Sequence, residues 1–266
     1  RARWRPVTNF GYAHPAHQAW MVLDRVRTEL FAEAIRRTVK PGDVVLDVGT
    51  GSGVLALLAA KAGARRVFAV ERGDAYMLAR RHVEENGLSH VIEVLHTDLT
   101  KIDALPEQPD VIVSEMLGHF APDEAIHPIF RRAKALCKPD VRMIPGSYRL
   151  LFSVAELPQL ASDVAYLRGG LDITLDAIAT RILRAPELSN VEAEHLLGPE
   201  VPGDLFAVDA PEPLRFACDV VVSRTGTCNA LVLAFESELA PGVCLRTSPH
   251  DAATHWEIGR ASCRER

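Results

Sequence analysis

The chain has 266 residues, a net charge of −5 at pH 7 and 48% hydrophobic residues, enough for one large domain or one domain and part of a second. The acidic balance and the lack of a basic run argue against a nucleic-acid-binding surface and favour a cationic partner. No apolar run is long enough for a membrane span and no secretory signal is visible, so we expect no membrane contact. Five cysteines without a Cys-x-x-Cys pair indicate reduced thiols in a cytoplasmic protein, and we expect neither a disulfide framework nor a metal site.

Hydrophobic periodicity divides the first part of the chain into alternating elements. Residues 19–37 have helical spacing, and Pro41 and Gly42 end that segment. Strands are then predicted over 44–48, 66–70, 91–96, 110–114 and 141–144, and helices over 53–62, 73–86 and 122–137. This alternation predicts an α/β fold: a doubly wound, Rossmann-like parallel sheet with right-handed crossovers.

A glycine-rich turn connects the first predicted strand to its helix. Gly49, Gly51 and Gly53 follow an apolar strand, and Glu71 ends the next strand about 20 residues later, as in units that bind a ribose. A dinucleotide site would have its third glycine at position 54, which is valine. The acid before the turn, Asp47, would repel a pyrophosphate but could hold the ammonium of a methionine moiety. The pattern therefore favours S-adenosylmethionine over NAD.

Acidic residues collect where the predicted strands end. Asp47, Glu71, Asp98 and Glu115 all fall at the carboxyl edge of the sheet, where ligands of such folds bind. Glu124 begins the next helix nine positions after Glu115, and the loop between them can turn both carboxylates toward one pocket. Two carboxylates can pair with the planar fork of a guanidinium group. A glutamate in a first helical turn also compensates the helix dipole, so Glu124 alone is ambiguous.

The pattern changes after Ile144-Pro145-Gly146. Alternating runs over 148–154, 214–222, 229–239 and 242–247 predict the antiparallel strands of a second domain. We divide the chain into an N-terminal helical segment (1–38), a cofactor-binding Rossmann-like domain (39–145) and a second, antiparallel domain (146–256). Residues 257–266 look like translated sequencing adapter, and we expect the native sequence to stop near Trp256.

Four separated motifs make the chain resemble the protein arginine N-methyltransferases over about residues 10–256. Tyr12-Ala-His14 with Met21–Arg27 resembles the family's N-terminal helix, and Val44–Gly53 its cofactor loop. Glu115 and Glu124 match its double-E loop, and Thr254-His-Trp256 matches its Thr-His-Trp loop. The resemblance implies transfer of a methyl group from S-adenosylmethionine to an arginine guanidinium in a protein or peptide substrate. It also implies that residues 1–38 cap the cofactor, that 146–256 are a truncated β-barrel that binds the substrate, and that the full-length protein is a homodimer through an arm at about 157–190.

The resemblance also implies a role for each matching residue. Glu115 and Glu124 would grip the substrate guanidinium, and Asp24 and His255 would form a supporting catalytic pair that offers a route for the proton. The cofactor would be bound by Arg27 at its carboxylate, by Glu71 at its ribose and by Asp98, Leu99 and Thr100 at its adenine, with Gln18, Asp47, Gly49 and Gly51 lining the site. Gln18 stands where the family has a histidine. Met21 and Trp256 would border the substrate.

Two questions stay open at this level. The double-E loop interior resembles the symmetric-dimethylating branch, whereas Thr-His-Trp is typical of the asymmetric branch. Two alternatives to a protein methyltransferase also remain: an enzyme that methylates a small amine or guanidine metabolite, and a non-catalytic module whose Glu115 and Glu124 hold a basic segment of a partner.

Overall fold

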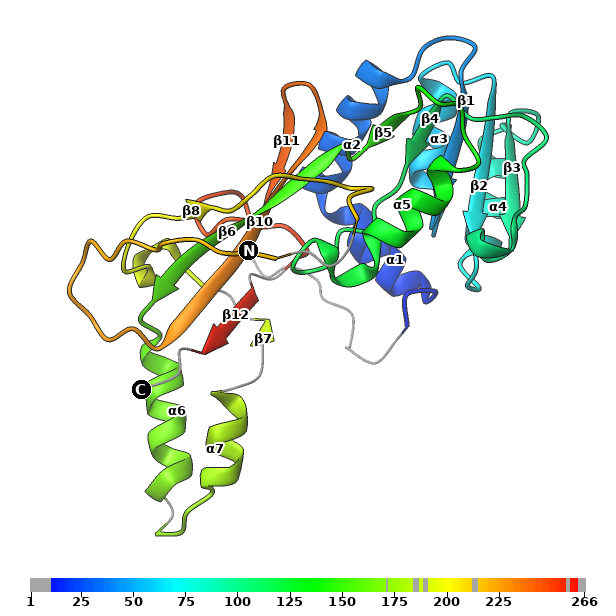
Figure 1. The fold of residues 1–266 in the computed structure, drawn as a ribbon. Coiled ribbons are helices and arrows are strands. Elements are labelled where there is room, and N and C mark those ends of the chain that lie inside the picture. Colours follow the sequence, from blue (N-terminus) through cyan, green and yellow to red (C-terminus); the bar gives the residue numbers. More distant parts are fainter. Residues whose placement is uncertain are drawn as a thin grey trace.

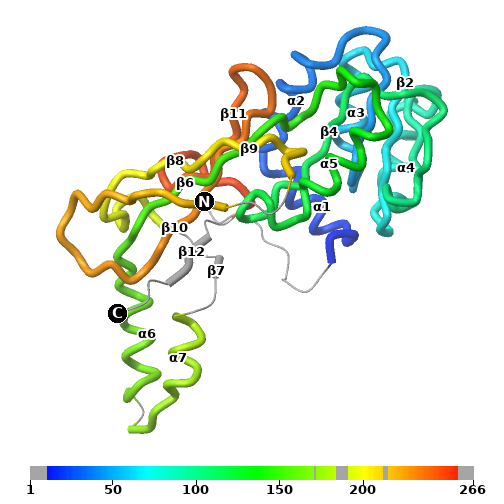
Figure 2. The backbone as a smooth tube through the Cα atoms, viewed as in Figure 1, coloured from blue at the N-terminus to red at the C-terminus, as the bar shows by residue number. Residues whose placement is uncertain are grey.

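The computed structural model describes residues 11–170, 172–183, 187–188, 191–211, 215–256 and 259–262. Its first part is a parallel sheet with helices on both faces (Figures 1 and 2), so the predicted doubly wound α/β fold is confirmed. The strands are β1 (Val44–Val48), β2 (Arg66–Glu71), β3 (Ile92–His96), β4 (Val111–Val113) and β5 (Arg142–Ile144), and the helices among them are α3 (Val54–Lys61), α4 (Tyr76–Glu85) and α5 (Ile126–Lys134). The strand order β3-β2-β1-β4-β5 reverses between β1 and β4, and a ligand crevice is expected outside the carboxyl ends of the strands at that point.

The N-terminal segment forms two helices, so the prediction of one continuous helix over 19–37 is wrong at residue 24, where the first helix has ended. They are α1 (Pro15–Leu23) and α2 (Arg25–Thr38). Asp24 leaves the helical conformation between them with ψ 88°, and its side chain accepts a hydrogen bond from the backbone N–H of Arg27. A short polar side chain that caps the next helix competes with continuation of the previous one.

The loop before α5 also differs from the predicted helix over 122–137. A single 3₁₀ turn, η2 (Pro122–Glu124), precedes α5, and Ala125 between them has a left-handed backbone with φ 59°. A second short turn, η1 (Leu99–Lys101), follows β3. Both turns lie near the carboxyl edge of the parallel sheet.

The second part is an antiparallel sheet. Its strands are β6 (Ser147–Ala155), β7 (Glu187–Leu188), β8 (Val201–Pro202), β9 (Phe206–Ala207), β10 (Ala230–Ala240), β11 (Val243–Arg246) and β12 (Gly259–Ser262), with the 3₁₀ turn η3 (Ala193–His195) before β8. At its centre, β6 pairs along its whole length with residues 230–238 of β10. The change from the parallel to the antiparallel sheet falls between Ile144 and Ser147. The predicted parallel sheet followed by an antiparallel region is thus present.

One predicted strand is absent. Residues 215–222 form no strand, and Leu214 lies outside the described residues. Phe216, Cys218 and Val220 nevertheless pack against the core while their neighbours are exposed. The alternation of apolar and polar residues therefore reflects an extended segment that buries one face but pairs with no neighbouring strand among the described residues.

Strand β12 comes from the ten residues that the sequence analysis sets aside as a tail. It pairs with the β10 edge opposite β6, although residues 257–258 and 263–266 of that tail lie outside the described residues. One strand edge of β10 is thus covered in this structure. Whether the segment belongs to the natural protein stays a prediction.

Helices α6 (Pro158–Gly169) and α7 (Asp176–Ile182) project from the end of the antiparallel sheet away from the parallel sheet (Figure 1). They pack with β6 and β10 in a small core of their own, whereas the main core spans both sheets. Within the described residues no helix is both long and apolar enough to cross a membrane.

Candidate active site

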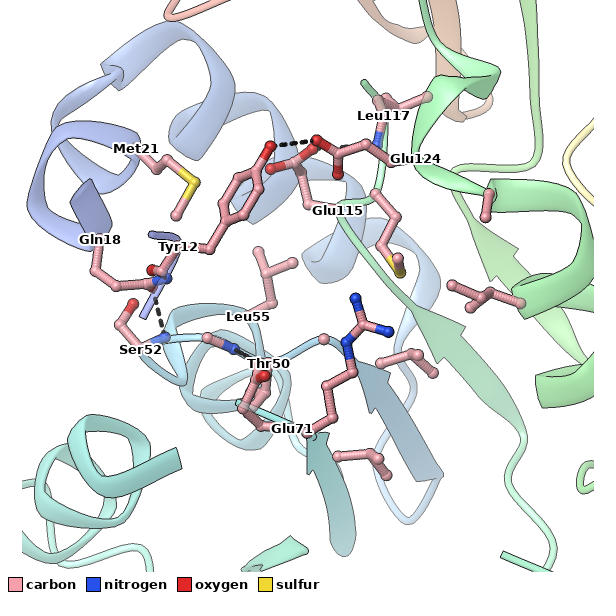
Figure 3. Close-up of a pocket in the computed structure, with 18 of the residues that line it drawn as sticks. Tyr12, Gln18, Met21, Thr50, Ser52, Leu55, Glu71, Glu115, Leu117 and Glu124 are labelled. Carbon is pink, nitrogen blue, oxygen red and sulfur yellow. Dashed lines mark hydrogen bonds between the residues drawn. The ribbon is translucent and has the colours of Figure 1, made fainter. Parts of the chain in front are cut away.

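A cavity of about 720 Å³ opens at the carboxyl ends of β1, β2 and β4 (Figure 3). The glycine turn, Glu71 and the segment Asp98–Thr100 line one part of it, and Glu115 and Glu124 line another part. The cavity is therefore continuous from the expected cofactor residues to the expected substrate residues. Among the described residues no cluster of three potential ligands could hold a metal ion.

The conformation of the glycine turn is fixed by its glycines and by hydrogen bonds to the Glu71 side chain. Gly49, Gly51 and Gly53 have φ values of 70°, 54° and 85°, a backbone conformation that residues with a Cβ rarely adopt. Glu71 accepts hydrogen bonds from Gly51 N at 2.9 Å and from Gly73 N at 2.7 Å, so its carboxylate is fixed beside the turn. A ribose-binding acid needs such a fixed position because two hydroxyls must meet it together.

Gln18 of α1 closes over the same turn. Its Oε1 accepts a hydrogen bond from Ser52 N at 2.8 Å, and its Nε2 donates to the carbonyl of Tyr12 at 2.7 Å. A Cβ on Gly51 would lie 2.7 Å from Gln18 Oε1, so a side chain at residue 51 would push Gln18 away from its present position. Gln18 lines the cavity, but its contacts in this structure are with the protein backbone.

Asp47 does not line the cavity, so the structure contradicts its expected contact with a cofactor ammonium. Its side chain is fully buried beneath the turn and accepts a hydrogen bond from Thr50 Oγ1 at 2.5 Å. Burial raises the pKa of this carboxyl to about 7, although the Thr50 hydrogen bond opposes the shift. Topology fixes the sheet edge at which Asp47 lies but not the direction of its side chain.

We expect Asp47 to make the folded protein less stable as the pH rises. The folded carboxyl keeps its proton up to about pH 7, whereas the unfolded one loses it near the ordinary aspartate pKa of 3.8. The free energy of unfolding should therefore fall between about pH 4 and 7, by up to about 4 kcal/mol. Asp47→Asn should abolish this decline, measured by denaturant titration at pH 5 and 8. The exposed Asp74→Asn is the control, and an unchanged pH slope in Asp47→Asn would refute the assignment.

The segment after β3 forms the far end of the cavity. Asp98 accepts hydrogen bonds from Thr100 N and Oγ1 at 2.8 and 2.6 Å, and these bonds, the side-chain bond first, lower the pKa of Asp98. Leu99 is buried between them and supplies an apolar surface. An ionised acceptor beside an apolar surface suits the amino edge and the ring face of a purine.

Arg27 and Glu115 form a buried ion pair inside the cavity. Arg27 Nε and Nη2 donate to Glu115 Oε2 at 2.9 and 2.7 Å, and the two side chains are only 7% and 8% exposed. Arg27 Nη1 also donates to the carbonyl of Met21 at 3.3 Å. The residue expected to hold the cofactor carboxylate is therefore bonded to one that is expected to hold the substrate.

The other expected substrate carboxylate contacts Tyr12. The Tyr12 hydroxyl donates to Glu124 Oε1 at 2.7 Å, and Figure 3 shows the ring crossing the cavity between Met21 and the two glutamates. Burial, this hydrogen bond and the charge of Glu124 raise the pKa of Tyr12, so its phenol stays a donor. Burial also raises the pKa of Glu124, as do the charges of Glu115 and Asp123, while the Tyr12 hydrogen bond opposes this.

We expect Tyr12→Phe to move the acidic limb of the pH–activity profile to higher pH. Only charged Glu124 pairs fully with a guanidinium, so activity should rise as Glu124 loses its proton. The Tyr12 hydrogen bond lowers the pKa of Glu124, and its removal therefore raises that pKa. The measurement is kcat/KM for arginine methylation against pH. Tyr76→Phe, which alters a ring outside the cavity, is the control. If the acidic limb of Tyr12→Phe coincided with that of the parent, the hydrogen bond between Tyr12 and Glu124 would be contradicted.

Asp24 and His255 meet as the resemblance implies. Asp24 Oδ2 accepts from the backbone N of His255 at 2.5 Å and lies 2.9 Å from its Nδ1. Burial alone would raise the pKa of Asp24, but the hydrogen bonds from His255 and Arg27 outweigh it and lower that pKa. The neighbouring Trp256 donates from Nε1 to the carbonyl of Leu117 at 2.7 Å, which fixes it against the double-E loop.

A row of aromatic rings that the sequence did not predict lies along this wall. Tyr12, His17, Trp20 and His255 follow one another edge to face, with ring centroids 4.9, 5.5 and 5.5 Å apart. All four line the cavity. Burial and the charges of His255 and His14 lower the pKa of His17, which favours its neutral form. His17 and Trp20 have i, i+3 spacing on α1, but the sequence does not define which face of that helix turns toward the cavity.

Comparison with known proteins gives the family. Residues 26–145 match the family model for ribosomal protein L11 methyltransferase (PrmA). Over 250 residues the chain is 33% identical to an arginine N(omega)-methyltransferase of Streptomyces achromogenes subsp. streptozoticus, covering 90% of this chain and 68% of that protein. The chain belongs to the arginine N-methyltransferase family.

Other arginine methyltransferases are similar over nearly the whole chain. A histone-arginine methyltransferase CARMER of Anopheles gambiae is 29% identical over 270 residues, which are 92% of this chain but only 42% of that relative. The chain thus spans less than half of that protein. The structure of Trypanosoma brucei PRMT1, an enzyme-prozyme heterotetrameric complex with AdoHcy, has a TM-score of 0.87 and 26% identity, covering 96% of this chain and 84% of that one. Arabidopsis thaliana protein arginine methyltransferase 10 shares the fold, with a TM-score of 0.79.

Proposed function

We propose that this chain transfers a methyl group from S-adenosylmethionine to a guanidinium nitrogen of arginine in a peptide or protein. The observation that carries the proposal is the continuous cavity. It joins the glycine turn and Glu71 to two carboxylates, Glu115 and Glu124. A methyl donor at one end and a guanidinium at the other would meet inside it.

The residues present fit the proposed donor. Residue 51 is a glycine, so no side chain fills the space beside Gln18 at the cavity. The Glu71 carboxylate also lines the cavity and is fixed there by its hydrogen bond from Gly51 N. Arg27 has five N–H donors, and its contacts with Glu115 and Met21 use three of them, so the second N–H of each terminal nitrogen can meet a carboxylate. S-adenosylmethionine would supply a methyl group made electrophilic by a sulfonium.

The protein's part in the reaction is orientation and charge. Glu115 and Glu124 would hold the guanidinium in the line of attack and stabilise the positive charge that it keeps. Because its pKa is raised, the Glu124 carboxylate is a stronger proton acceptor than an ordinary glutamate, and its Oε2, which the Tyr12 hydroxyl does not contact, can take the proton that the methylated nitrogen loses. Asp24 holds Nδ1 of His255, so the ring keeps one orientation on the cavity wall.

Free arginine is a second candidate substrate. The printed name of the Streptomyces relative specifies arginine without a protein, whereas the CARMER relatives are named for histone arginine. Both substrates present the same guanidinium to Glu115 and Glu124. They differ in the charges of the free amino acid's own amino and carboxyl groups.

The test is methyl transfer from labelled S-adenosylmethionine to an arginine-rich peptide, to free L-arginine and to a small-amine mixture, with products identified by mass spectrometry. We expect methylarginine in the peptide. Label only in free arginine would move the assignment to the second candidate. Bound donor without product in any arm would refute methyl transfer and favour the non-catalytic module.

We also propose that α6 and α7 contact a second copy of the chain. Tyr166 and Ile178 on these helices are 55% and 50% exposed, and Ile173 in the connection is 57% exposed. Large apolar side chains gathered on a projecting hairpin favour a protein–protein contact. Light scattering of the chain and of a variant with all three replaced by serine would test it.

A further inference from the structure

Glu124 is held on a strained turn. The turn η2 that carries it lies between Ala121 and Ala125, whose φ values are 60° and 59°. Residues with a Cβ avoid this region, and such conformations persist only where the surrounding structure imposes them. The direction of the Glu124 carboxylate therefore depends on what holds the two ends of the turn.

The end before the turn is held by contacts within the loop and by Trp256. Gly118 and Ala121 exchange backbone hydrogen bonds of 3.1 and 3.0 Å, and Asp123 Oδ1 accepts from Phe120 N at 3.0 Å. Trp256 bonds the carbonyl of Leu117 just before it. This end is tied to the loop itself and to the Thr-His-Trp segment.

The end after the turn is tied to the antiparallel sheet. His127, in the first turn of α5 and three residues beyond Glu124, is 1% exposed, and its Nε2 lies 2.7 Å from the hydroxyl of Tyr148 on β6. Tyr148 is fully buried and packs against Phe206 of β9. Neither His127 nor Tyr148 lines the cavity. This hydrogen bond thus connects α5, which follows the double-E loop, to β6 of the antiparallel sheet.

We propose that Tyr148 and His127 are positioning residues for Glu124. The inference rests on the proposed function, since it assigns them a part in orienting the substrate carboxylate. A buried polar pair is costly unless it is hydrogen-bonded, and a hydrogen bond constrains distance and angle more tightly than an apolar contact. The pair therefore fixes α5, and with it the strained turn, relative to β6. Loss of the bond lets the turn relax and the carboxylate shift.

The first test is Tyr148→Phe, which removes the hydroxyl and keeps the ring. We expect kcat for peptide methylation to fall about tenfold or more, because a misplacement of about 1 Å can cost up to ~10²-fold in rate. Cofactor affinity by calorimetry should stay unchanged. Ser153→Ala is the matched control: it removes another buried hydroxyl of β6, whose bond goes to the carbonyl of Gly198, away from α5. Equal kcat in the two variants would overturn the proposal, as would a parallel loss of cofactor affinity.

Two further variants separate positioning from simple loss of stability. His127→Gln keeps an amide near the position of Nε2 and should retain more activity than His127→Leu. In a Glu124→Gln background, Tyr148→Phe should cause no further loss, because it acts through Glu124. A full additional loss in that background would contradict the inference.

A readout without turnover separates this inference from the proposed function. Tyr148→Phe should speed amide exchange of residues 118–126 while leaving β1 and β2 unchanged, and Ser153→Ala should not. An active parent with unaltered exchange in Tyr148→Phe would refute the positioning role alone. An inactive parent whose exchange responds as expected would refute methyl transfer and leave the link intact.

Discussion

Glu124→Gln is expected to reduce arginine methylation by about 10²–10³-fold, the usual effect of removing one electrostatic partner of a transition state. The amide keeps the shape of the side chain but not the charge that pairs with a guanidinium. Cofactor affinity should not change, since Glu124 contacts Tyr12 and not the glycine turn. Steady-state kinetics on an arginine peptide and calorimetry with the donor measure the two quantities.

Glu115→Gln provides an informative comparison. It should lose as much turnover, but it should also tighten donor binding, because it removes a carboxylate that competes for Arg27. Glu29→Gln, on the exposed face of α2, is the control for both variants. Parent-like turnover in either Glu115→Gln or Glu124→Gln would remove that residue from the substrate site.

Glu71→Ala is expected to weaken donor binding by roughly 1.5–3 kcal/mol, or about 10–100-fold in Kd. The variant loses the acceptor for ribose hydroxyls and also the hydrogen bonds that hold Gly51 and Gly73. Glu71→Gln separates the two effects, since its amide retains one acceptor oxygen for the backbone but no charge. Calorimetry on Glu93→Ala, an exposed residue of β3, is the control. Unchanged affinity in Glu71→Ala would show that the donor binds elsewhere.

The parallel sheet and its ligand edge could be predicted because they follow from local patterns. The glycine turn, Glu71 and Glu115 each stand beside an apolar strand, and strand topology alone brings such positions to one edge. The pairs Arg27–Glu115 and Tyr12–Glu124 could not be predicted in this way. They join residues 88 and 112 positions apart, and only the packing of α1 and α2 onto the sheet sets which side chain meets which.

The errors have related causes. Residues 215–222 alternate as a strand does, but strand formation needs a partner ladder that periodicity does not report. Asp24 lies within a run of helical spacing and ends a helix there through a capping bond. Asp47 lies at the predicted edge, yet its side chain is turned beneath the turn. In each case a tertiary contact decided between two conformations that the local sequence allows.

The continuity of the cavity has a consequence for inhibitor design. Because Glu71 and Glu124 line one enclosure, an adenosine group and a guanidinium group can be joined by a short linker and occupy both ends at once. The second group then binds at the millimolar effective concentration set by the linker, and the avidity can exceed that of either half by about 10²–10⁴-fold. The guanidinium of such a bivalent ligand would compete with Arg27 for the Glu115 carboxylate, so its affinity would depend on the strength of that ion pair in the free protein.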